Sequence, residues 1–291
     1  MVKKISDLYI ATRRVFMQEE TPEEAGYIAR ELLCRATGRS KEQLLTELDA
    51  YAEDDVIRSL GDMVHRVRQG EPLAYVLGEW EFYGMPLTVT SDVLIPRDDT
   101  CAVTSLAIKK ALFLDQDPRI LDLCTGSGCI GLAVAKRVKD ARVTLADISR
   151  EALAVARKNA FANKLSARVR CVQADALEEP AAVLGKFDMI VSNPPYITGR
   201  EMEALPHSVK DYEPHLALYG GEDGLVFYRA IAKNYALALK PGGFLCFEFG
   251  MGQGDDVCAI LEENGYTILE RTRDDNQRER AVLAQYGRKD V

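Results

Sequence analysis

The chain has 291 residues, of which 47% are hydrophobic and 28% charged, so we expect one large globular domain accompanied by a small one. Its formal net charge of −8 argues against a broad basic surface, and no direct nucleic-acid binding is expected. Seven scattered cysteines without a C-x-x-C pair, and three scattered histidines, argue against a disulfide framework and a metal site. Without a signal-peptide pattern or a long apolar stretch, we expect a cytoplasmic protein that does not span a membrane.

Residues 1–70 are predicted to form a small helical bundle. Thr21 is a typical N-cap because a proline and two acidic residues follow it, and the helix that it begins should end near Gly38. Residues 41–48 form a short amphipathic segment, and apolar side chains recur at helical spacing in residues 53–69. No chemistry is visible in this region, so packing and partner contacts are its expected roles.

Residues 71–96 have a different character and are predicted to link two domains. Segment 80–90 resembles two short strands around a turn that contains Gly84, and it holds the only tryptophan, Trp80. Such an aromatic hairpin can be a core element or one wall of a substrate site, and the sequence leaves both open.

From residue 97 to 291 the pattern alternates between strands and helices and predicts one α/β domain. Apolar runs predict strands at residues 119–124, 142–147, 168–173, 187–192, 244–249 and 266–270. Helical stretches lie between most of them, at residues 149–163, 225–239 and 252–264. This alternation predicts a parallel, doubly wound sheet.

A glycine-rich turn follows the first of these strands. Gly126, Gly128 and Gly131 satisfy G-x-G-x-x-G, and Asp147 ends the next strand, where it can accept hydrogen bonds from the two hydroxyls of a ribose. The pattern is that of a dinucleotide site. Its physical content is broader, because any cofactor that contains adenosine can use a close backbone and a carboxylate.

Two further acids point away from a dinucleotide. Asp122 lies at the first strand end, where a carboxylate would repel a pyrophosphate but suits a cationic amino-acid group. Asp175 ends the third strand and can meet an adenine amino group. Three acids at successive strand ends therefore suit a ligand with a positive end and no phosphate, such as S-adenosylmethionine.

The sequence Asn193-Pro194-Pro195-Tyr196 directly follows the strand predicted at residues 187–192. Two prolines end the strand and stiffen the loop, at the edge where open α/β sheets bind ligands. The Asn193 side-chain oxygen and the main-chain carbonyls of Asn193 and Pro194 are then fixed acceptors beside an aromatic ring. This loop is suited to hold an NH2 group during its reaction. Glu248, at a later strand end, is expected only to order a loop.

The chain resembles class I methyltransferases that act on a planar nitrogen, through DLCTGSGCIG at residues 122–131, QAD at 173–175 and SNPPYI at 192–197. More narrowly, it resembles the HemK/PrmC type of protein-(glutamine-N5) methyltransferase, which modifies the GGQ glutamine of class I peptide chain release factors. The narrower resemblance is carried by PLAYVLGEWEFYG at 72–84, LIPRDDT at 94–100, LALYGGEDGLVFYR at 216–229 and LKPGGFLCFEFGMGQ at 239–253.

The resemblance implies a substrate-recognising helical domain at residues 1–70, a hairpin linker at 71–96 and a Rossmann-like methyltransferase domain at 97–291. It implies that the cofactor S-adenosylmethionine contacts the following residues: Asp122, Cys124, Thr125, Gly126, Ser127, Gly128, Asp147, Asp175, Ala176 and Asn193. It also implies that Asn193, Pro194, Pro195 and Tyr196 bind the target glutamine, with Asn193, Pro194 and Tyr196 acting in catalysis.

The chain departs from the family pattern in three places. Cys124 stands where a glycine is usual, Ala176 replaces a bulkier residue, and residues 96–101 lack a proline and a later glutamate.

The sequence leaves three other functions open. A nucleic-acid methyltransferase acting on an exocyclic amine such as adenine N6 would use the same acceptors on a flipped base, but a basic target-recognition segment is not evident. A nicotinamide dehydrogenase accounts for the glycines and leaves the Asn193–Tyr196 sequence unexplained. A non-catalytic cofactor-binding adaptor would bind the cofactor without transferring its methyl group.

Overall fold

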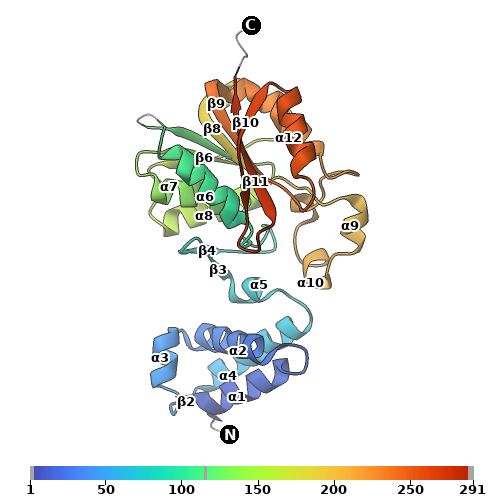
Figure 1. Ribbon diagram of the computed structural model, residues 1–291. Helices are drawn as coiled ribbons and strands as arrows, with labels where there is room; N and C mark the ends of the chain where they lie inside the picture. The colour runs from blue at the N-terminus through green and yellow to red at the C-terminus, as the bar shows by residue number, and fades with distance from the viewer. Residues whose placement is uncertain (1–2, 115–116, 288–291) are drawn as a thin grey trace. The chain divides into compact units, whose positions relative to one another are not determined.

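The computed structural model describes residues 3–114 and 117–287 (Figure 1). The chain divides into two compact units, Met1–Gly78 and Glu79–Val291. None of the described helices is long and apolar enough to cross a membrane.

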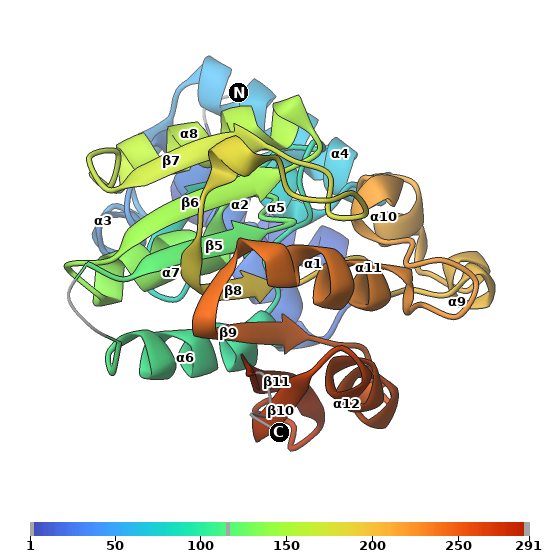
Figure 2. The same cartoon turned by 90° about the horizontal axis from the view of Figure 1, so that it is seen from above.

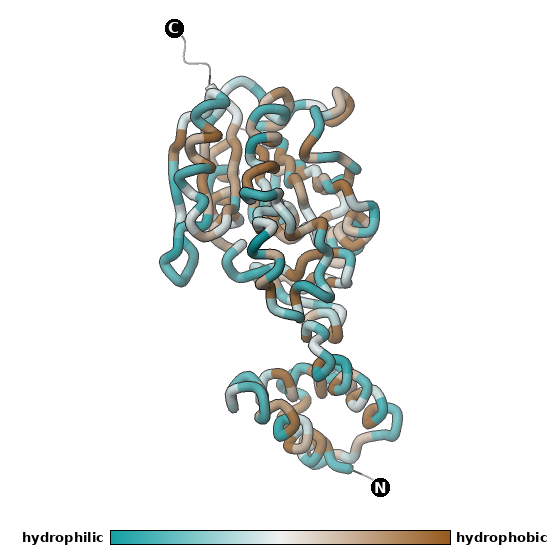
Figure 3. The backbone as a smooth tube through the Cα atoms, turned by 90° about the vertical axis from the view of Figure 1, so that its right-hand side faces the viewer, coloured by the Kyte–Doolittle hydropathy of each residue, from teal (hydrophilic) through white to brown (hydrophobic). Residues whose placement is uncertain are grey.

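The first unit is a bundle of helices with one short two-stranded ladder. Its elements are α1 (Ile5–Phe16), α2 (Pro22–Thr37), α3 (Lys41–Thr46), α4 (Asp54–Arg68) and α5 (Leu73–Leu77), with β1 (Lys3–Lys4) paired antiparallel to β2 (Tyr51–Ala52). Thr21 caps α2 as predicted, because its side chain accepts from the Glu24 amide while Glu24 bonds back to the Thr21 amide. The helices alternate hydrophobic and hydrophilic segments along the tube (Figure 3), and their apolar faces form one core.

The second unit is an α/β domain. Its strands are β3 (Glu79–Phe82), β4 (Met85–Thr88), β5 (Arg119–Leu123), β6 (Arg142–Asp147), β7 (Val169–Gln173), β8 (Phe187–Ser192), β9 (Leu239–Glu248), β10 (Tyr266–Arg273) and β11 (Glu279–Tyr286). Its α-helices are α6 (Thr100–Ala111), α7 (Cys129–Arg137), α8 (Arg150–Ala162), α9 (Gly199–Glu203), α10 (His207–Lys210), α11 (Val226–Asn234) and α12 (Gly254–Glu263). Short 3-10 turns lie at Ala182–Leu184, His215–Ala217 and Tyr235–Ala238.

Strands β3 and β4 form the predicted hairpin. Tyr83 and Gly84 both have positive φ, 52° and 70°, which is the pattern of a two-residue type I′ turn. The hairpin packs within the second unit, because Phe82, Met85 and Leu87 are buried in the same core as α6, α7 and α8.

The other seven strands form one sheet in the order β10-β11-β9-β8-β5-β6-β7. Strands β7, β6, β5, β8 and β9 are parallel neighbours, as predicted. The predicted parallel sheet is extended at one edge by an antiparallel pair, because β11 runs antiparallel to both β9 and β10. No strand was predicted from the sequence at the position of β11.

Both faces of the sheet are buried. Alternate strand residues enter two cores, with Ile120 and Val191 on the side of α6, α7 and α8, and Leu121 and Ile190 on the side of α11 and α12. Figure 2 shows α6 and α12 near β9, β10 and β11, with α8 beside β7 at the other edge of the sheet. Burial on two faces explains why these strands read as continuous apolar runs.

Candidate functional site

The candidate site lies where the order of the strands reverses. After β5 the chain builds β6 and β7 on one side, and then returns to place β8 on the other side of β5. The carboxyl ends of β5 and β8 therefore diverge at a topological switch point, which is where open α/β sheets bind ligands. The glycine-rich turn follows β5 and the Asn193–Tyr196 loop follows β8, so two segments far apart in sequence meet here.

The glycine-rich turn joins β5 to α7 in a tight bend. Gly128 has φ 85°, a left-handed conformation that glycine adopts without strain, and it directly precedes α7. Gly131 lies in α7 so close to β6 that an added Cβ would come within 2.3 Å of Leu145 Cδ2. Cys124 also has positive φ, 59°, which explains why a glycine is the usual residue at this position.

Asp122 lies beneath this turn. Its Oδ2 accepts hydrogen bonds from the Thr125 hydroxyl at 2.5 Å and from the Gly131 amide at 2.8 Å, while Oδ1 is buried without a partner. Complete burial raises the pKa of Asp122 to about 7, against the effect of these two hydrogen bonds. Asp122 is not among the residues that line the cavity described below, and its visible role is to hold the turn.

Asp147 and Asp175 lie at the next two strand ends. Asp147 Oδ2 accepts from the Gly126 amide at 2.9 Å and Oδ1 from the Ser149 amide at 3.0 Å, and burial raises the pKa of this carboxyl. Asp175 Oδ1 accepts from the Leu177 amide at 2.9 Å. Each carboxylate oxygen keeps further lone pairs, so both side chains can still accept from a ligand.

Three glycines lie so close to the Asn193–Tyr196 loop that a side chain at any of them would overlap with it. A Cβ on Gly220 would lie 2.6 Å from Tyr196 Cα, and one on Gly224 would lie 2.4 Å from the Tyr196 carbonyl oxygen. A Cβ on Gly250 would lie 3.0 Å from Tyr196 Cδ2. The loop is also paired at its end, because Ile197 forms a parallel bridge with Tyr219. These contacts explain the glycines in the two segments quoted at residues 216–229 and 239–253.

The loop's polar groups have distinct surroundings. Asn193 Nδ2 donates to Thr100 Oγ1 at 3.4 Å, and the Tyr196 hydroxyl donates to Glu248 Oε1 at 3.4 Å. Burial and the neighbouring Glu248 raise the pKa of Tyr196. Tyr196 therefore stays a neutral hydroxyl at physiological pH.

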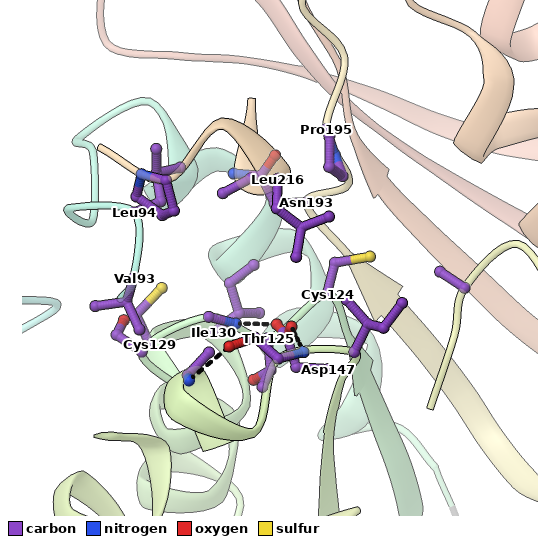
Figure 4. Close-up of a pocket in the computed structure, with 18 of the residues that line it drawn as sticks. Val93, Leu94, Cys124, Thr125, Cys129, Ile130, Asp147, Asn193, Pro195 and Leu216 are labelled. Carbon is purple, nitrogen blue, oxygen red and sulfur yellow. Dashed lines mark hydrogen bonds between the residues drawn. The ribbon is translucent and has the colours of Figure 1, made fainter. Parts of the chain in front are cut away.

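A cavity opens at the carboxyl ends of β5, β6, β7 and β8 (Figure 4). Of the predicted residues, it is lined by Cys124, Thr125, Gly126, Ser127, Asp147, Asp175, Ala176, Asn193 and Pro195. Gly128, Pro194 and Tyr196, like Asp122, are placed beside it and are not lining residues. In Figure 4, Asn193 and Cys124 project from neighbouring strand ends, with Asp147 below them.

Several lining residues were not predicted from the sequence. Val93 and Leu94 come from the segment before α6, Leu216 from the segment between α10 and α11, and Phe227 from α11. The last two lie within the segment quoted at residues 216–229, which was the only signal for them.

A buried acid, Glu213, connects the segment that contains Val93 and Leu94 to the segment that contains Leu216. Glu213, with 4% of its surface exposed, accepts from the Ile95 amide at 3.2 Å and forms an ion pair with Arg97. This contact joins residues 116 and 118 positions apart in the chain.

The charged side chains that line the cavity are mostly acidic. Among the described lining residues, three are aspartates (Asp92, Asp147 and Asp175) and one is an arginine, Arg97, which is already paired with Glu213. In the part of the chain that the structure describes, no group of three or more His, Cys, Asp or Glu side chains could hold a metal ion. All seven cysteines are free thiols.

The fold and this site define a class I (Rossmann-like) methyltransferase domain. The Methyltransferase small domain family matches residues 102–239, and the PrmC N-terminal domain family matches residues 10–78. A methyltransferase from Pyrococcus furiosus has a similar fold, with a TM-score of 0.51 at 18% identity, covering 78% of this chain and 99% of that chain.

Two curated relatives narrow this class. The release factor glutamine methyltransferase of Clostridium acetobutylicum is 39% identical over 84% of this chain and 85% of its own length. That of Geobacter sulfurreducens is 37% identical over 94% of each chain. The chain therefore belongs to the release factor glutamine methyltransferase family.

Proposed function

We propose that the protein transfers a methyl group from S-adenosylmethionine to the side-chain amide nitrogen (N5) of the glutamine in the GGQ motif of class I peptide chain release factors, in the cytoplasm. The observation that carries the proposal is the Asn193–Tyr196 loop, fixed at the switch point beside an acidic cavity, in a chain of this family.

The cavity fits this cofactor better than it fits a dinucleotide. Its three aspartates favour a ligand with a positive charge, and its single arginine is engaged by Glu213, so no free cation faces a pyrophosphate among the described lining residues. Ser127 lines the cavity, and its buried hydroxyl has no hydrogen-bond partner among the described residues, so we propose that a polar group of the ligand pairs with it.

We assign the contacts of the cofactor as follows. The turn from Cys124 to Gly128 would lie against it, with Asp122 ordering the turn from below. Asp147 would accept from the ribose hydroxyls, and Asp175 with Ala176 would lie near adenine. Phe227 would supply the aromatic surface that Ala176 lacks. When bound, S-adenosylmethionine supplies an electrophilic methyl group on a positively charged sulfur.

The residues after β8 would place and activate the substrate nitrogen. An amide nitrogen is a weak nucleophile because its lone pair is delocalised into the carbonyl group. Asn193 Oδ1 and the Pro194 carbonyl would accept its two N–H bonds, which aims the lone pair and stabilises positive charge that develops on nitrogen. Tyr196 would pack on the amide plane, with Pro195 completing the binding surface. The surplus proton leaves to water after the transfer.

The helical unit would recognise the release factor. Its described surface exposes apolar side chains on three elements, namely Ile10 of α1, Leu45 of α3 and Tyr51 of β2. Covering exposed apolar side chains with a partner surface is favourable, because it removes apolar area from water. We therefore propose that this unit contributes affinity for the partner, while the chemistry belongs to the second unit.

Asn193→Ala tests the proposal directly. Removing one of two acceptors should lower kcat by about 10²- to 10³-fold while cofactor binding persists. Asn264→Ala is the matched control, because Asn264 caps the end of α12 by bonding to the Ile260 carbonyl and does not line the cavity. Near-wild-type turnover by an Asn193→Ala enzyme that binds the cofactor would contradict the mechanism.

A further inference from the structure

The side chain of Gln253 joins three segments around the Asn193–Tyr196 loop, yet it has no part in the proposed chemistry. Gln253 ends the segment quoted at residues 239–253 and directly precedes α12. Its Nε2 donates to the Tyr196 carbonyl at 3.1 Å and to the Gly224 carbonyl at 3.4 Å, and its Oε1 accepts from the Gly250 amide at 2.8 Å. One side chain therefore ties the segment after β8 to the segments before α11 and after β9.

The surroundings of this side chain require a carboxamide. Two carbonyl oxygens need a donor and one main-chain N–H needs an acceptor, and a glutamine amide supplies two donated protons and one accepting oxygen. The neighbours also leave little space. A Cβ on Gly224 would lie 2.5 Å from Gln253 Nε2, and one on Gly250 would lie 2.8 Å from Gln253 Oε1. Two of the three glycines beside the loop thus make room for Gln253 as well.

The bond to the Tyr196 carbonyl matters because the loop is stiff. Pro194 and Pro195 have a fixed φ, so a displacement of the Tyr196 main chain is carried back to the Pro194 carbonyl, the proposed acceptor two residues earlier. The Asn193 end of the loop is fixed by β8, which it directly follows. The other end is held by Gln253 and by the Ile197 amide, which donates to the Leu218 carbonyl at 2.9 Å.

We infer that Gln253 is a positioning residue for methyl transfer, which holds the Tyr196 end of the loop so that the Pro194 carbonyl and the Tyr196 ring meet the substrate amide. The inference rests on the proposed function. Gln253 is not among the described residues that line the cavity, so it acts through Tyr196 and not by touching the cofactor. Its loss should lower kcat and leave cofactor affinity nearly unchanged.

Gln253→Glu tests the inference, because the change keeps the shape of the side chain and makes its donors depend on pH. The ionised carboxylate cannot donate and faces two carbonyl oxygens, so it pushes the loop away. We expect kcat to fall by about 10²-fold near pH 8, the effect of a displacement of about 1 Å. The two carbonyls favour the protonated carboxyl, which again donates to Tyr196. The ratio of variant to wild-type kcat should therefore rise by about tenfold as the pH falls toward about 5.5.

Other titratable groups do not produce this change in the ratio. Those on the segments around Gln253 are Tyr196 after β8, Glu222 and Asp223 before α11, Arg229 in α11, Glu248 at the end of β9, Asp255 and Asp256 in α12, and Arg271 in β10. Asp223 pairs with Arg229 at 2.6 Å, and Asp255 with Arg271 at 2.7 Å. Glu248 titrates in the tested range, because burial raises its pKa to about 7. Its titration is common to the variant and the wild type, so it cancels in the ratio of their kcat values.

Two further variants separate positioning from a general effect of charge. Gln253→Met removes the three hydrogen bonds without adding a charge, so kcat should be about tenfold below that of the wild type at every pH. Gln285→Glu is the matched control, because Gln285 Nε2 also donates to a glycine carbonyl, that of Gly242 at 2.9 Å, but in the amino-terminal half of β9. Its kcat ratio should not change with pH. Circular dichroism and calorimetry measure the folded fraction and the cofactor affinity of each variant at each pH.

The outcomes separate this inference from the proposed function. A wild-type enzyme that leaves the release factor unlabelled contradicts the proposed function, and the positioning role with it. With an active wild type, three results would each overturn the role of Gln253 alone. These are a kcat ratio of folded Gln253→Glu that is independent of pH, an equal pH dependence in Gln285→Glu, and wild-type kcat in Gln253→Met.

Discussion

Gly220 lies directly against the loop that would bind the substrate amide, and replacing it is a sharp test of that loop's position. A Cβ at this position would lie 2.6 Å from Tyr196 Cα and 2.7 Å from the Pro195 carbonyl oxygen, where ordinary contact begins at 3.4 Å. Both neighbours are backbone atoms, so no side chain can rotate away. Gly220→Ala must therefore push the loop.

The size of the effect follows from this overlap. Moving the nearest contact from 2.6 Å to 3.4 Å displaces the loop by about 0.8 Å. A misplacement of about 1 Å at a reacting centre can cost about 10²-fold in rate. We expect kcat to fall by about that factor, while cofactor affinity changes much less because Asp147 and the turn at residues 124–128 stay in place.

The assay is transfer of a labelled methyl group to a release factor, with cofactor affinity measured by calorimetry. Gly287→Ala is the control, because a Cβ there meets nothing within 4 Å and its φ is not left-handed. If Gly220→Ala folds and turns over like the wild type, the position of this loop does not limit the reaction.

Three further predictions concern the cavity. Burial holds the pKa of Asp122 near 7 in the folded state, so stability should fall as pH rises from about 4 to 7, by on the order of 4 kcal/mol for this group. Asp122→Asn should remove that part of the slope in urea unfolding, and an unchanged slope would count against burial as the cause. Cys124→Gly relieves about 1–2 kcal/mol of left-handed backbone strain, but it also adds freedom to the unfolded chain and removes side-chain packing. The free energy of unfolding should therefore change by no more than about 1 kcal/mol. A large loss of stability would contradict the presence of strain at this position. Glu213→Gln should weaken cofactor binding by about tenfold, because the contact with Arg97 loses its charge. Equal cofactor affinity in calorimetry would show that Glu213 does not hold the cavity wall in place.

Local signals in the sequence were sufficient for much of the fold. The capping residues around Thr21, the turn at Gly84 and the apolar runs of the parallel strands each depend on neighbouring residues. Placing Asp147, Asp175 and Asn193 together also needed only one rule, because parallel strands end at the same edge of a sheet.

Contacts that span long stretches of chain could not be predicted in this way. Strand β11 begins with the charged pair Glu279-Arg280 after a polar turn, and only its pairing with β9 and β10 makes it part of the sheet. The bonds of Glu213 to the Ile95–Arg97 segment, and that of Thr100 to Asn193, each join residues more than 90 positions apart.

The direction of a side chain at a strand end was equally beyond the sequence. Asp122 was expected to face a cationic group of the ligand. In the structure its carboxylate lies beneath the turn and bonds to α7 through Gly131, because the bend at Cys124 turns the chain over it. Which way such a side chain points depends on the conformation of the whole loop.

The central claim is that this chain methylates the glutamine of a GGQ motif. Purified enzyme with labelled S-adenosylmethionine should transfer the label to a class I release factor and leave its GGQ Gln→Ala variant unlabelled. Label on both proteins, or on neither, would contradict the claim.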